Sequence, residues 1–329
     1  MNVAIVGCGL VGAKRAASLG AERLTLCADT DEGRAAKLAA TVPEAKHVTD
    51  WRQAVSAPDV DLVIVATPHH LLAEIALGAV TAGKHVLVEK PAAISAAELD
   101  PIIDAAKRTG RLVRVGFNHR YHPALRKARR LVEAGELGEL MFVRGRYGHG
   151  GRLGYEQEWR ACKELSGGGE LIDQGIHLID LARMFLGEFV DVQGIARNYY
   201  WNADVEDNAF LLLQTATRQV AFLHASWTEW KNMFSFEIMG REGKLDIRGK
   251  GGSYGTERIT WYRMLKEMGP PETRIWEYPR GDSSWEVEFQ ELLEDIRTGR
   301  EPSPSARDAQ EALRIVERVY DLSGQSGNG

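Results

Sequence analysis

The chain has 329 residues, with 41 basic and 46 acidic side chains and a formal net charge of −5 at pH 7. This balance includes no basic run, so we expect no nucleic acid partner. No apolar stretch reaches about 18 residues and no leader pattern is present, so we predict neither a membrane span nor a signal peptide. Cys8, Cys27 and Cys162 lie far apart without zinc-ligand spacing. This cysteine usage predicts a cytoplasmic protein without disulfides.

The first third of the chain alternates short apolar strands with Ala-rich helices. Because such alternation requires right-handed crossovers, it predicts a doubly wound parallel sheet, the Rossmann fold. We expect a dinucleotide-binding domain over residues 1–120. Its strands are expected near 2–6, 23–28, 60–66, 84–89 and 111–117, and its helices near 11–19, 31–40, 69–82 and 95–109.

A glycine pattern follows the first predicted strand, where Gly7, Gly9 and Gly12 lead into a helix. In a dinucleotide-binding fold the first glycine permits a tight turn, the second admits the pyrophosphate, and the third allows close helix packing. The helix start adds free N–H donors and a positive dipole end. We therefore predict that a dinucleotide is bound by the backbone of Gly7, Gly9, Leu10, Val11 and Gly12.

Asp29 ends the second predicted strand, about 20 residues after the glycines, where an acid can bind the adenosine ribose. The same residue also suits a turn or a helix N-cap. Because a carboxylate repels a 2′-phosphate, NAD is the expected cofactor. Thr30 and Arg34 nevertheless leave NADP open.

The apolar strand at 85–89 ends in Glu89-Lys90-Pro91. Ligands of open α/β sheets bind at the carboxyl ends of the strands, so Lys90 is placed to donate to a substrate hydroxyl. Pro91 fixes the backbone just after it. Each residue also has a purely structural explanation: Lys90 as a solvated cation, Glu89 as its ion-pair partner, and Pro91 as the entry to a helix.

Further along, Gly167-Gly168-Gly169 precede an apolar helix predicted over 171–186. Asp173 and His177 are four residues apart, so they share one face of that helix. The glycines would let the backbone approach a ligand, and we interpret the pair as mounted on a rigid element that faces a site. The alternative is a helix-start carboxylate and a satisfied buried histidine. Asp180 suits support of the imidazole, capping, or an ion pair within the helix.

The rest of the chain differs in composition, because of its 9 Phe, 8 Trp and 9 Tyr residues only Trp51 and Phe117 precede position 119. We predict an α+β substrate-binding and oligomerisation domain over 121–329, with an open, mainly antiparallel sheet of about six strands covered by helices on one face. Strands are expected at Leu140–Tyr147, Val190–Tyr200, Asn208–Thr215, Gln219–Trp227, Phe234–Met239, Lys244–Arg248 and Arg258–Tyr262. A last helix at about 306–322 is expected to pack back toward the first domain, and 323–329 to form a mobile tail.

Together these segments resemble the Gfo/Idh/MocA oxidoreductases, a family of sugar and cyclitol dehydrogenases and reductases, over essentially the whole chain. The resemblance rests on the three glycines, Ala66-Thr67-Pro68, Glu89-Lys90-Pro91, Val115–Tyr121, Trp159-Arg160 and Gly167–Asp180. In the family the corresponding lysine, aspartate and histidine surround the reacting carbon, so the resemblance implies that Lys90, Asp173 and His177 are catalytic. It also implies that the nicotinamide end is lined by Thr67, Pro68, Glu89, Asn118, Trp159 and Arg160. Leu72 departs from the histidine that many members carry there.

Oxidation of a secondary alcohol needs a base that takes the hydroxyl proton as hydride leaves the same carbon. We expect His177 to be this general acid and base, and Lys90 to stabilise the developing alkoxide charge. Asp173 would orient the substrate or tune the other two. No metal is expected, since His69-His70 and the pair His119 and His122 lack a spaced carboxylate or cysteine.

The substrate is less well defined by the sequence. Aromatic and polar residues around 147–152, 227–232 and 251–254 suit a hydroxyl-rich ring, although the same aromatics would fill a core or a subunit interface. The candidates for substrate binding are Lys90, Arg120, Tyr147, Arg152, Lys163, Asp173, His177 and Tyr254. A sugar, a cyclitol and a nucleotide-activated sugar all remain open, as do an NAD-dependent glycoside hydrolase and a dinucleotide-sensing regulator of the same fold.

The uncovered face of the second sheet is expected to carry apolar side chains. We place Phe210, Leu212, Phe222 and Phe234 there. A single chain cannot bury such a face, which predicts a homodimer or homotetramer that associates through it.

Overall fold

The structure is a computed structural model that describes residues 1–267 and 269–324. The chain divides into two compact units. Unit 1 comprises Met1–Phe117, Glu164–Gly167 and Trp285–Arg314, and unit 2 comprises Asn118–Lys163, Gly168–Ser284 and the residues from Ile315 onward. The predicted domain limits, 1–120 and 121–329, stay a prediction.

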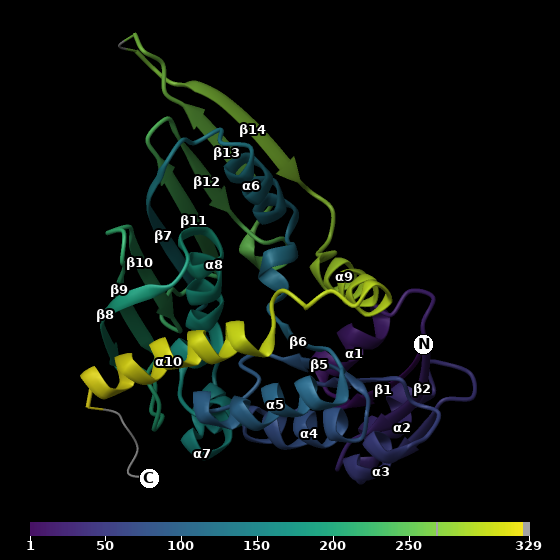
Figure 1. Cartoon of the computed structure of the whole chain (residues 1–329). Coiled ribbons are helices and arrows are strands. Elements are labelled where there is room, and N and C mark those ends of the chain that lie inside the picture. Colours follow the sequence, from purple (N-terminus) through teal and green to yellow (C-terminus); the bar gives the residue numbers. More distant parts are fainter. Residues whose placement is uncertain (268, 325–329) are drawn as a thin grey trace. The chain divides into compact units, whose positions relative to one another are not determined.

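Unit 1 contains a six-stranded parallel sheet with the order β3-β2-β1-β4-β5-β6 (Figure 1). The strands are β1 (Asn2–Val6), β2 (Arg23–Ala28), β3 (Lys46–Val48), β4 (Leu62–Val65), β5 (His85–Glu89) and β6 (Val113–Gly116). The helices are α1 (Leu10–Ala17), α2 (Glu32–Ala39), α3 (Trp51–Ser56), α4 (His69–Thr81), the 3₁₀ turn η1 (Ala96–Glu98), α5 (Leu99–Thr109) and most of α9 (Ser284–Thr298). This arrangement confirms the predicted Rossmann sheet.

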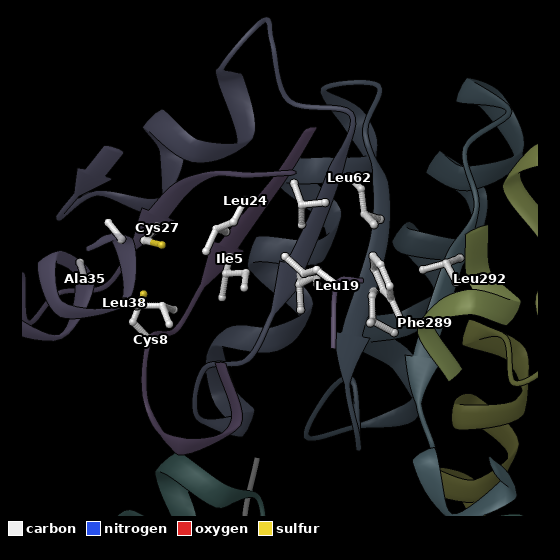
Figure 2. Packing of buried hydrophobic residues seen from close by; sticks show 14 residues of the cluster. Ile5, Cys8, Leu19, Leu24, Cys27, Ala35, Leu38, Leu62, Phe289 and Leu292 are labelled. Carbon is white, nitrogen blue, oxygen red and sulfur yellow. The ribbon is translucent and has the colours of Figure 1, made fainter. Parts of the chain in front are cut away.

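The core of unit 1 contains buried strands of this sheet and side chains from α9. All residues of β4 and β5 are buried, as expected for strands covered on both faces. Ile5 and Leu24 pack with Phe289 and Leu292, which come from α9 near the end of the chain (Figure 2). Helix α9 therefore completes the hydrophobic core of the first sheet. Its residue Phe289 follows Leu24 by about 260 residues in the sequence.

Two short elements of unit 1 were not predicted. Strand β3 has the sequence Lys46-His47-Val48, and two of its three residues are exposed. It therefore lacks the apolar run on which the strand prediction depended. Helix α3 spans only six residues and is capped by Asp50, whose side chain accepts from the backbone N–H of Arg52.

Unit 2 contains an eight-stranded sheet with the order β14-β13-β12-β11-β7-β10-β9-β8. The strands are β7 (Leu140–Gly148), β8 (Phe189–Arg197), β9 (Asn208–Thr215), β10 (Val220–Ser226), β11 (Met233–Gly240), β12 (Gly243–Arg248), β13 (Glu257–Arg263) and β14 (Glu272–Tyr278). All neighbours are antiparallel except β10 and β7, which are parallel. The mainly antiparallel sheet is confirmed, but the expected six strands are too few.

Of the eight strands, the one outside the seven ranges expected from the sequence is β14, an edge strand with mostly exposed side chains. Helix α6 (Pro123–Glu133) was also not predicted, although Ala124, Leu125, Ala128 and Leu131 form a buried stripe with helical spacing. The tail prediction at 323–329 falls mostly on residues 325–329, which lie outside the described part of the chain. Ser323 itself is held, because its hydroxyl accepts from the backbone N–H of Ala196 at 2.8 Å.

The two faces of this sheet differ. Helix α8 (Ile176–Leu186) covers one of them, and Leu178 would touch a Cβ added at Gly145 of β7 at 3.1 Å. The opposite face leaves Ile195, Leu212 and Phe222 about half exposed, at 53%, 46% and 48%. Phe234 was placed on this open face wrongly: it pairs with Tyr147, points to the covered side and is 3% exposed. Because side chains alternate between the two faces of a strand, the register of β11 decides which face Phe234 occupies.

No helix within residues 1–267 and 269–324 has the length and hydropathy that a membrane span needs.

Candidate functional site

The three glycines of the unit 1 loop differ in their surroundings. Gly7 has a φ of +93°, which favours glycine, and a Cβ there would lie 2.5 Å from the carbonyl carbon of Ala66. A Cβ at Gly12 would lie 2.0 Å from the carbonyl oxygen of Gly7, so helix α1 cannot approach the loop with any larger residue. A Cβ at Gly9 would meet nothing within 4 Å. Gly9 is therefore not required by the packing of the chain, and open space lies beside its backbone.

Asp29 follows β2 and holds this loop. One oxygen of its carboxylate accepts from the backbone N–H of Cys8 at 2.7 Å, and the other accepts from Asp31 at 2.9 Å. The N-cap of α2 is Asp31, whose side chain accepts from the backbone N–H of Arg34. Asp31 thus fills the role of helix cap that was also considered for Asp29, whereas Asp29 fixes the loop.

Thr67 lies at the end of β4, beside the same loop. Its hydroxyl is buried and has no hydrogen-bond partner among the residues that the structure describes. A buried hydroxyl normally finds a partner, so the side chain is suited to a bound group. Together with the open space at Gly9 and the carboxylate of Asp29, these residues fit the phosphate and ribose groups of a dinucleotide.

The Glu89-Lys90-Pro91 segment is held in place by a buried network of ion pairs that includes Glu89. The Arg15 guanidinium lies 2.5 Å from the Glu89 carboxylate and 2.6 Å from that of Glu288. The ion-pair partner of Glu89 is thus Arg15 of α1. The structural explanation considered from the sequence had paired Glu89 with Lys90. Burial raises the pKa of Glu288 to about 7, against the effect of the Arg15 cation and with the help of the Glu89 charge. Lys90 follows directly after this fixed carboxylate at the end of β5.

In unit 2, Asp173 and His177 lie on a helix that starts in an unusual way. Leu171–Gly175 form a π-helical turn, and α8 continues from Ile176. A π-turn has more than four residues per turn, so side chains four apart lie nearly in line, and such turns are frequent at functional sites. Both side chains are buried, each with 5% exposure.

The start of this helix is held by Glu206, which was not predicted. Its carboxylate accepts from the backbone N–H groups of Gly169 and Leu171, both at 2.9 Å, and from the hydroxyl of Tyr320 at 2.8 Å. A Cβ at Gly169 would lie 1.9 Å from the carbonyl oxygen of Glu206, and one at Gly168 would lie 2.0 Å from the Tyr320 hydroxyl. These two glycines therefore admit parts of the protein, which corrects the expectation that they admit a ligand.

Asp173 is paired within unit 2. Arg160 donates from Nε to Asp173 Oδ2 at 3.2 Å, and its guanidinium stacks on the Trp159 ring at 4.5 Å. Burial lowers the pKa of His149, and the nearby Asp173 carboxylate opposes this shift. Trp159, Arg160 and Asp173, which the sequence analysis assigned to different tasks, thus form one cluster.

His177 stacks on a second histidine. Its ring lies 3.8 Å from that of His119, with an angle of 14° between the planes. His119 Nε2 in turn lies 2.7 Å from Nζ of Lys250, which also donates to the Tyr147 hydroxyl at 2.7 Å. Tyr254, a predicted substrate residue, lies beside the same ammonium group, with 4.8 Å from Nζ to its ring centre. His119 and Lys250 were not among the predicted site residues.

The other predicted residues of unit 2 are more dispersed. Asp180 forms a buried bidentate ion pair with Arg120, at 2.8 and 2.5 Å. This partner belongs to the turn η2 (Asn118–Tyr121), whereas the ion pair considered from the sequence was one within the helix of Asp180. Asn118 donates to the Ser284 hydroxyl at 2.9 Å. Arg152 is exposed and paired with Glu158. The substrate roles of Arg120, Arg152 and Lys163 stay predictions.

The histidines considered for metal binding have other partners. His69 Nδ1 lies 2.8 Å from the carbonyl oxygen of Ser166, and His122 Nδ1 lies 3.0 Å from a carboxylate oxygen of Glu257. Within the described ranges, no group of three or more His, Cys, Asp or Glu side chains is arranged to hold a metal ion.

The Rossmann sheet and its glycine loop define a dinucleotide-binding protein with a second, mainly antiparallel sheet. A family model described as "Oxidoreductase family, NAD-binding Rossmann fold" matches residues 1–117, and one described as "GFO/IDH/MocA C-terminal domain" matches residues 125–246. The chain belongs to the Gfo/Idh/MocA oxidoreductase family and is NAD-dependent, which confirms the resemblance and the cofactor predicted from the sequence.

Individual relatives are sugar and cyclitol dehydrogenases. Levoglucosan dehydrogenase of Pseudarthrobacter phenanthrenivorans is 28% identical over 283 residues, covering 74% of this chain and 73% of the relative. The scyllo-inositol 2-dehydrogenase (NAD(+)) of Bacillus subtilis is 28% identical over 328 residues, covering 96% and 92%. A solved structure of levoglucosan dehydrogenase with NADH and levoglucosan is 25% identical with a TM-score of 0.89, covering 99% of this chain and 98% of that one.

Proposed function

We propose that this chain is an NAD-dependent dehydrogenase that oxidises a secondary alcohol of a free sugar, anhydrosugar or cyclitol, or reduces the corresponding ketone. The observation that carries the proposal is the buried pair Asp173 and His177 on one helical turn, with Arg160 held against Asp173. The pair supplies an imidazole for proton transfer and a carboxylate for a neighbouring hydroxyl. Its relatives act on polyhydroxylated rings, as their names state.

In this proposal each of three side chains has a distinct task. His177 takes the proton from the reacting hydroxyl and returns it in the reverse direction. The ammonium of Lys90 donates to the same oxygen and stabilises the negative charge that develops there. Asp173 accepts a hydrogen bond from an adjacent hydroxyl and so selects substrates with vicinal hydroxyl groups. The bound nicotinamide supplies the hydride acceptor in oxidation and the donor in reduction.

The surroundings of Asp173 support its role as an acceptor. The Arg160 guanidinium beside it favours the ionised carboxylate, because an opposite charge at hydrogen-bond distance stabilises that form. An ionised carboxylate has only acceptor sites, so it orients a hydroxyl by accepting its proton in a hydrogen bond. A substrate without a hydroxyl next to the reacting carbon would leave this buried charge without a ligand partner and should be a poor substrate.

We further propose that the substrate is not nucleotide-activated. Two of the cations that could meet a phosphate are engaged elsewhere, since Arg120 is paired with Asp180 and Arg152 with Glu158. Asp29, whose Oδ2 accepts from Cys8 of the glycine loop and whose Oδ1 accepts from Asp31, favours NAD over NADP through charge repulsion of a 2′-phosphate. The proposed site of action is the cytoplasm, in keeping with the three free cysteines.

The test is a substrate panel followed at the nicotinamide absorbance with NAD and with NADP. It contains aldoses, an anhydrosugar, inositol isomers, a deoxy analogue that lacks the vicinal hydroxyl, and a nucleotide sugar. We expect turnover of at least one free sugar, anhydrosugar or cyclitol with NAD, and at least 10-fold lower kcat/KM for the deoxy analogue. Turnover of the nucleotide sugar alone would overturn the substrate class. Cleavage of an aryl glycoside without net NADH would favour the hydrolase instead.

The assembly is also part of the proposal. The open face of the unit 2 sheet carries Ile195, Leu212 and Phe222 on neighbouring strands β8, β9 and β10, and each is about half exposed. Clustered apolar exposure of this kind marks an interaction surface. We propose that two copies of the chain associate through these strands, which light scattering at micromolar concentration tests directly.

A further inference from the structure

Lys250 has a cationic side chain directed into the covered side of the unit 2 sheet. It lies in the segment Gly249–Gly255, between β12 and β13, which contains the 3₁₀ turn η6 (Gly252–Tyr254). Gly249 has a φ of +71°, and a Cβ there would lie 2.4 Å from the carbonyl oxygen of Thr256. Gly251 also has a positive φ, of +81°. The glycines on both sides thus give the backbone the bend that turns Lys250 inward.

The ammonium group of Lys250 meets two nearly buried polar side chains. Its Nζ lies 2.7 Å from His119 Nε2 and 2.7 Å from the Tyr147 hydroxyl, while His119 is 3% and Tyr147 is 6% exposed. The same Nζ lies 4.0 Å from the centre of the Tyr147 ring and 4.8 Å from that of Tyr254. A cation above two aromatic faces and next to a hydroxyl is well stabilised.

An ammonium has three donors and no acceptor, so His119 Nε2 must accept from it. A ring nitrogen that accepts carries no proton, so the proton of His119 lies on Nδ1 and the ring is neutral. Burial raises the pKa of Tyr147 well above its usual range, with contributions from Tyr254 and Glu170. Tyr147 therefore remains a hydroxyl that accepts from Lys250.

His119 is the residue on which His177 rests. The two rings are nearly parallel, with 3.8 Å between their centres and 14° between their planes. If His119 took up a proton, its charge would face His177 directly and the pair would share that proton. A neutral His119 instead presents the face of an uncharged aromatic ring, which tolerates a positive charge on its neighbour.

We propose that Lys250 is a positioning residue, which keeps His119 in the neutral Nδ1–H form so that His177 alone accepts the substrate proton. This inference rests on the proposed function for the role of His177, and on geometry alone for the state of His119. Lys250 does not touch the reacting atoms in this account. It acts through the histidine stack.

Other charged and titratable groups also face the two histidines. They are Arg120 and His122 from the turn η2 (Asn118–Tyr121) and its continuation, Tyr147 from β7, Tyr254 from η6, and Glu170, Asp173 and Asp180 from the helix. Arg120 is neutralised by Asp180, and His122 is paired with Glu257. Lys250 Nζ is a further cation at the stack and lies 2.7 Å from His119 Nε2.

The direct test is ¹⁵N NMR of the histidine rings in the full chain without substrate. Assignments would come from His119→Gln and His177→Gln. In the wild-type protein we expect His119 to carry its proton on Nδ1 and to resist protonation down to low pH. In Lys250→Met, whose side chain has a similar length and no charge, the pKa of His119 should rise by about one unit or more.

The same variants can be tested by the pH dependence of kcat/KM. This dependence would not change if Lys250 had only a structural role. In Lys250→Met the histidine pair takes its first proton at higher pH, so the acidic limb of kcat/KM for alcohol oxidation should shift upward by about one pH unit. Activity above that limb should stay within several-fold of wild type. Lys250→Arg keeps the cation and should restore the limb. Lys244→Met is the matched control, because it removes a cation of β12 that pairs with Glu237 rather than with His119.

Several results would overturn the inference. They are a wild-type His119 protonated on Nε2, an equal titration of His119 in wild type and Lys250→Met, or a loss of activity in Lys250→Met that is the same at every pH. If Lys250→Met does not fold, the wild-type tautomer and Lys250→Arg decide. If no sugar or cyclitol is turned over, the proposed function fails while the NMR result still decides the state of His119.

Discussion

The two sheets of this protein present their chemistry in different ways. In unit 1 the strands β4 and β5 are buried on both faces, so their side chains form the core and the candidate site lies at the strand ends. In unit 2 one face is covered and one is open, and the candidate residues project from a helix, a turn and a loop over the covered face. A site built from backbone groups can be recognised from a local sequence pattern. A site built from converging side chains depends on residues that are far apart in the sequence.

One large expected effect concerns Lys90 of unit 1, the proposed donor to the substrate oxygen. Lys90→Ala should lower kcat by about 10²–10³, because it removes the donor to the developing alkoxide. Asp173→Asn should cost as much if the carboxylate tunes the other residues, and clearly less if it only orients substrate. Steady-state rates on the best substrate of the panel measure both. Wild-type kcat in Lys90→Ala would remove this lysine from the mechanism.

The glycine loop offers a contrast between folding and binding within unit 1. Gly12→Ala should lower the free energy of unfolding by about 1–3 kcal/mol, because the new Cβ meets the carbonyl oxygen of Gly7 at 2.0 Å. Gly9→Trp should leave the melting temperature unchanged, since a Cβ there meets nothing within 4 Å, yet weaken NAD binding at least 10-fold. Thermal melts and calorimetry separate the two. Equal NAD affinity in wild type and Gly9→Trp would show that the pyrophosphate lies elsewhere.

The ion network below Lys90 predicts a pH dependence of stability. Because the pKa of Glu288 is raised to about 7 in the folded chain, the folded state keeps a proton that the unfolded state releases. Stability from this group is therefore full at acidic pH and falls as the pH rises from about 4.5 to 7, by up to about 1.4 kcal/mol per pH unit. Above pH 7 two carboxylates share the single Arg15 cation.

Glu288→Gln should abolish that fall, which denaturant unfolding at several pH values can measure. Glu286→Gln on the exposed side of α9 is the matched control and should retain the wild-type profile. The same slope in wild type and Glu288→Gln would mean that Glu288 is ionised throughout this range.

The smallest expected effect concerns the open face of unit 2. Phe222→Arg should weaken self-association about 10-fold or more, because it places a charge in the apolar part of this face. Leu265→Arg alters a side chain with similar exposure, 46% against 48%, outside the sheet and should not. Sedimentation or light scattering over a concentration series provides the comparison. A wild-type monomer at micromolar concentration would contradict the proposed interface.

Much of unit 1 was predictable because its signals are local. The glycines, the acid at Asp29 and the strand end at Lys90 all lie where the pattern predicts them. The anchor of Glu89 was not, since Arg15 and Glu288 are 273 positions apart and only the fold brings them together. The strand alternation of β8 and β9 was readable, but β14 was missed because most of its side chains are exposed and carry no core pattern.

The candidate site of unit 2 was predicted only in part for the same reason. Asp173 and His177 lie four residues apart, and a helix period is enough to pair them. His119 and Lys250 are separated by 131 positions, and no short-range rule connects them. The sequence did contain a signal, since a lysine between glycines at 249–252 is unusual for a plain turn, but its target becomes apparent only when β12 is placed beside β11.

In the proposed function, His177 transfers the substrate proton, and unit 1 binds NAD independently of His177. The most direct measurement pairs kcat with the Kd for NAD in His177→Ala, with His224→Ala on the open face as the control. We predict that kcat falls by about 10²–10⁴ while the NAD Kd stays within about threefold of wild type. Full activity in His177→Ala, or a loss of NAD binding that matches the loss of rate, would contradict this account.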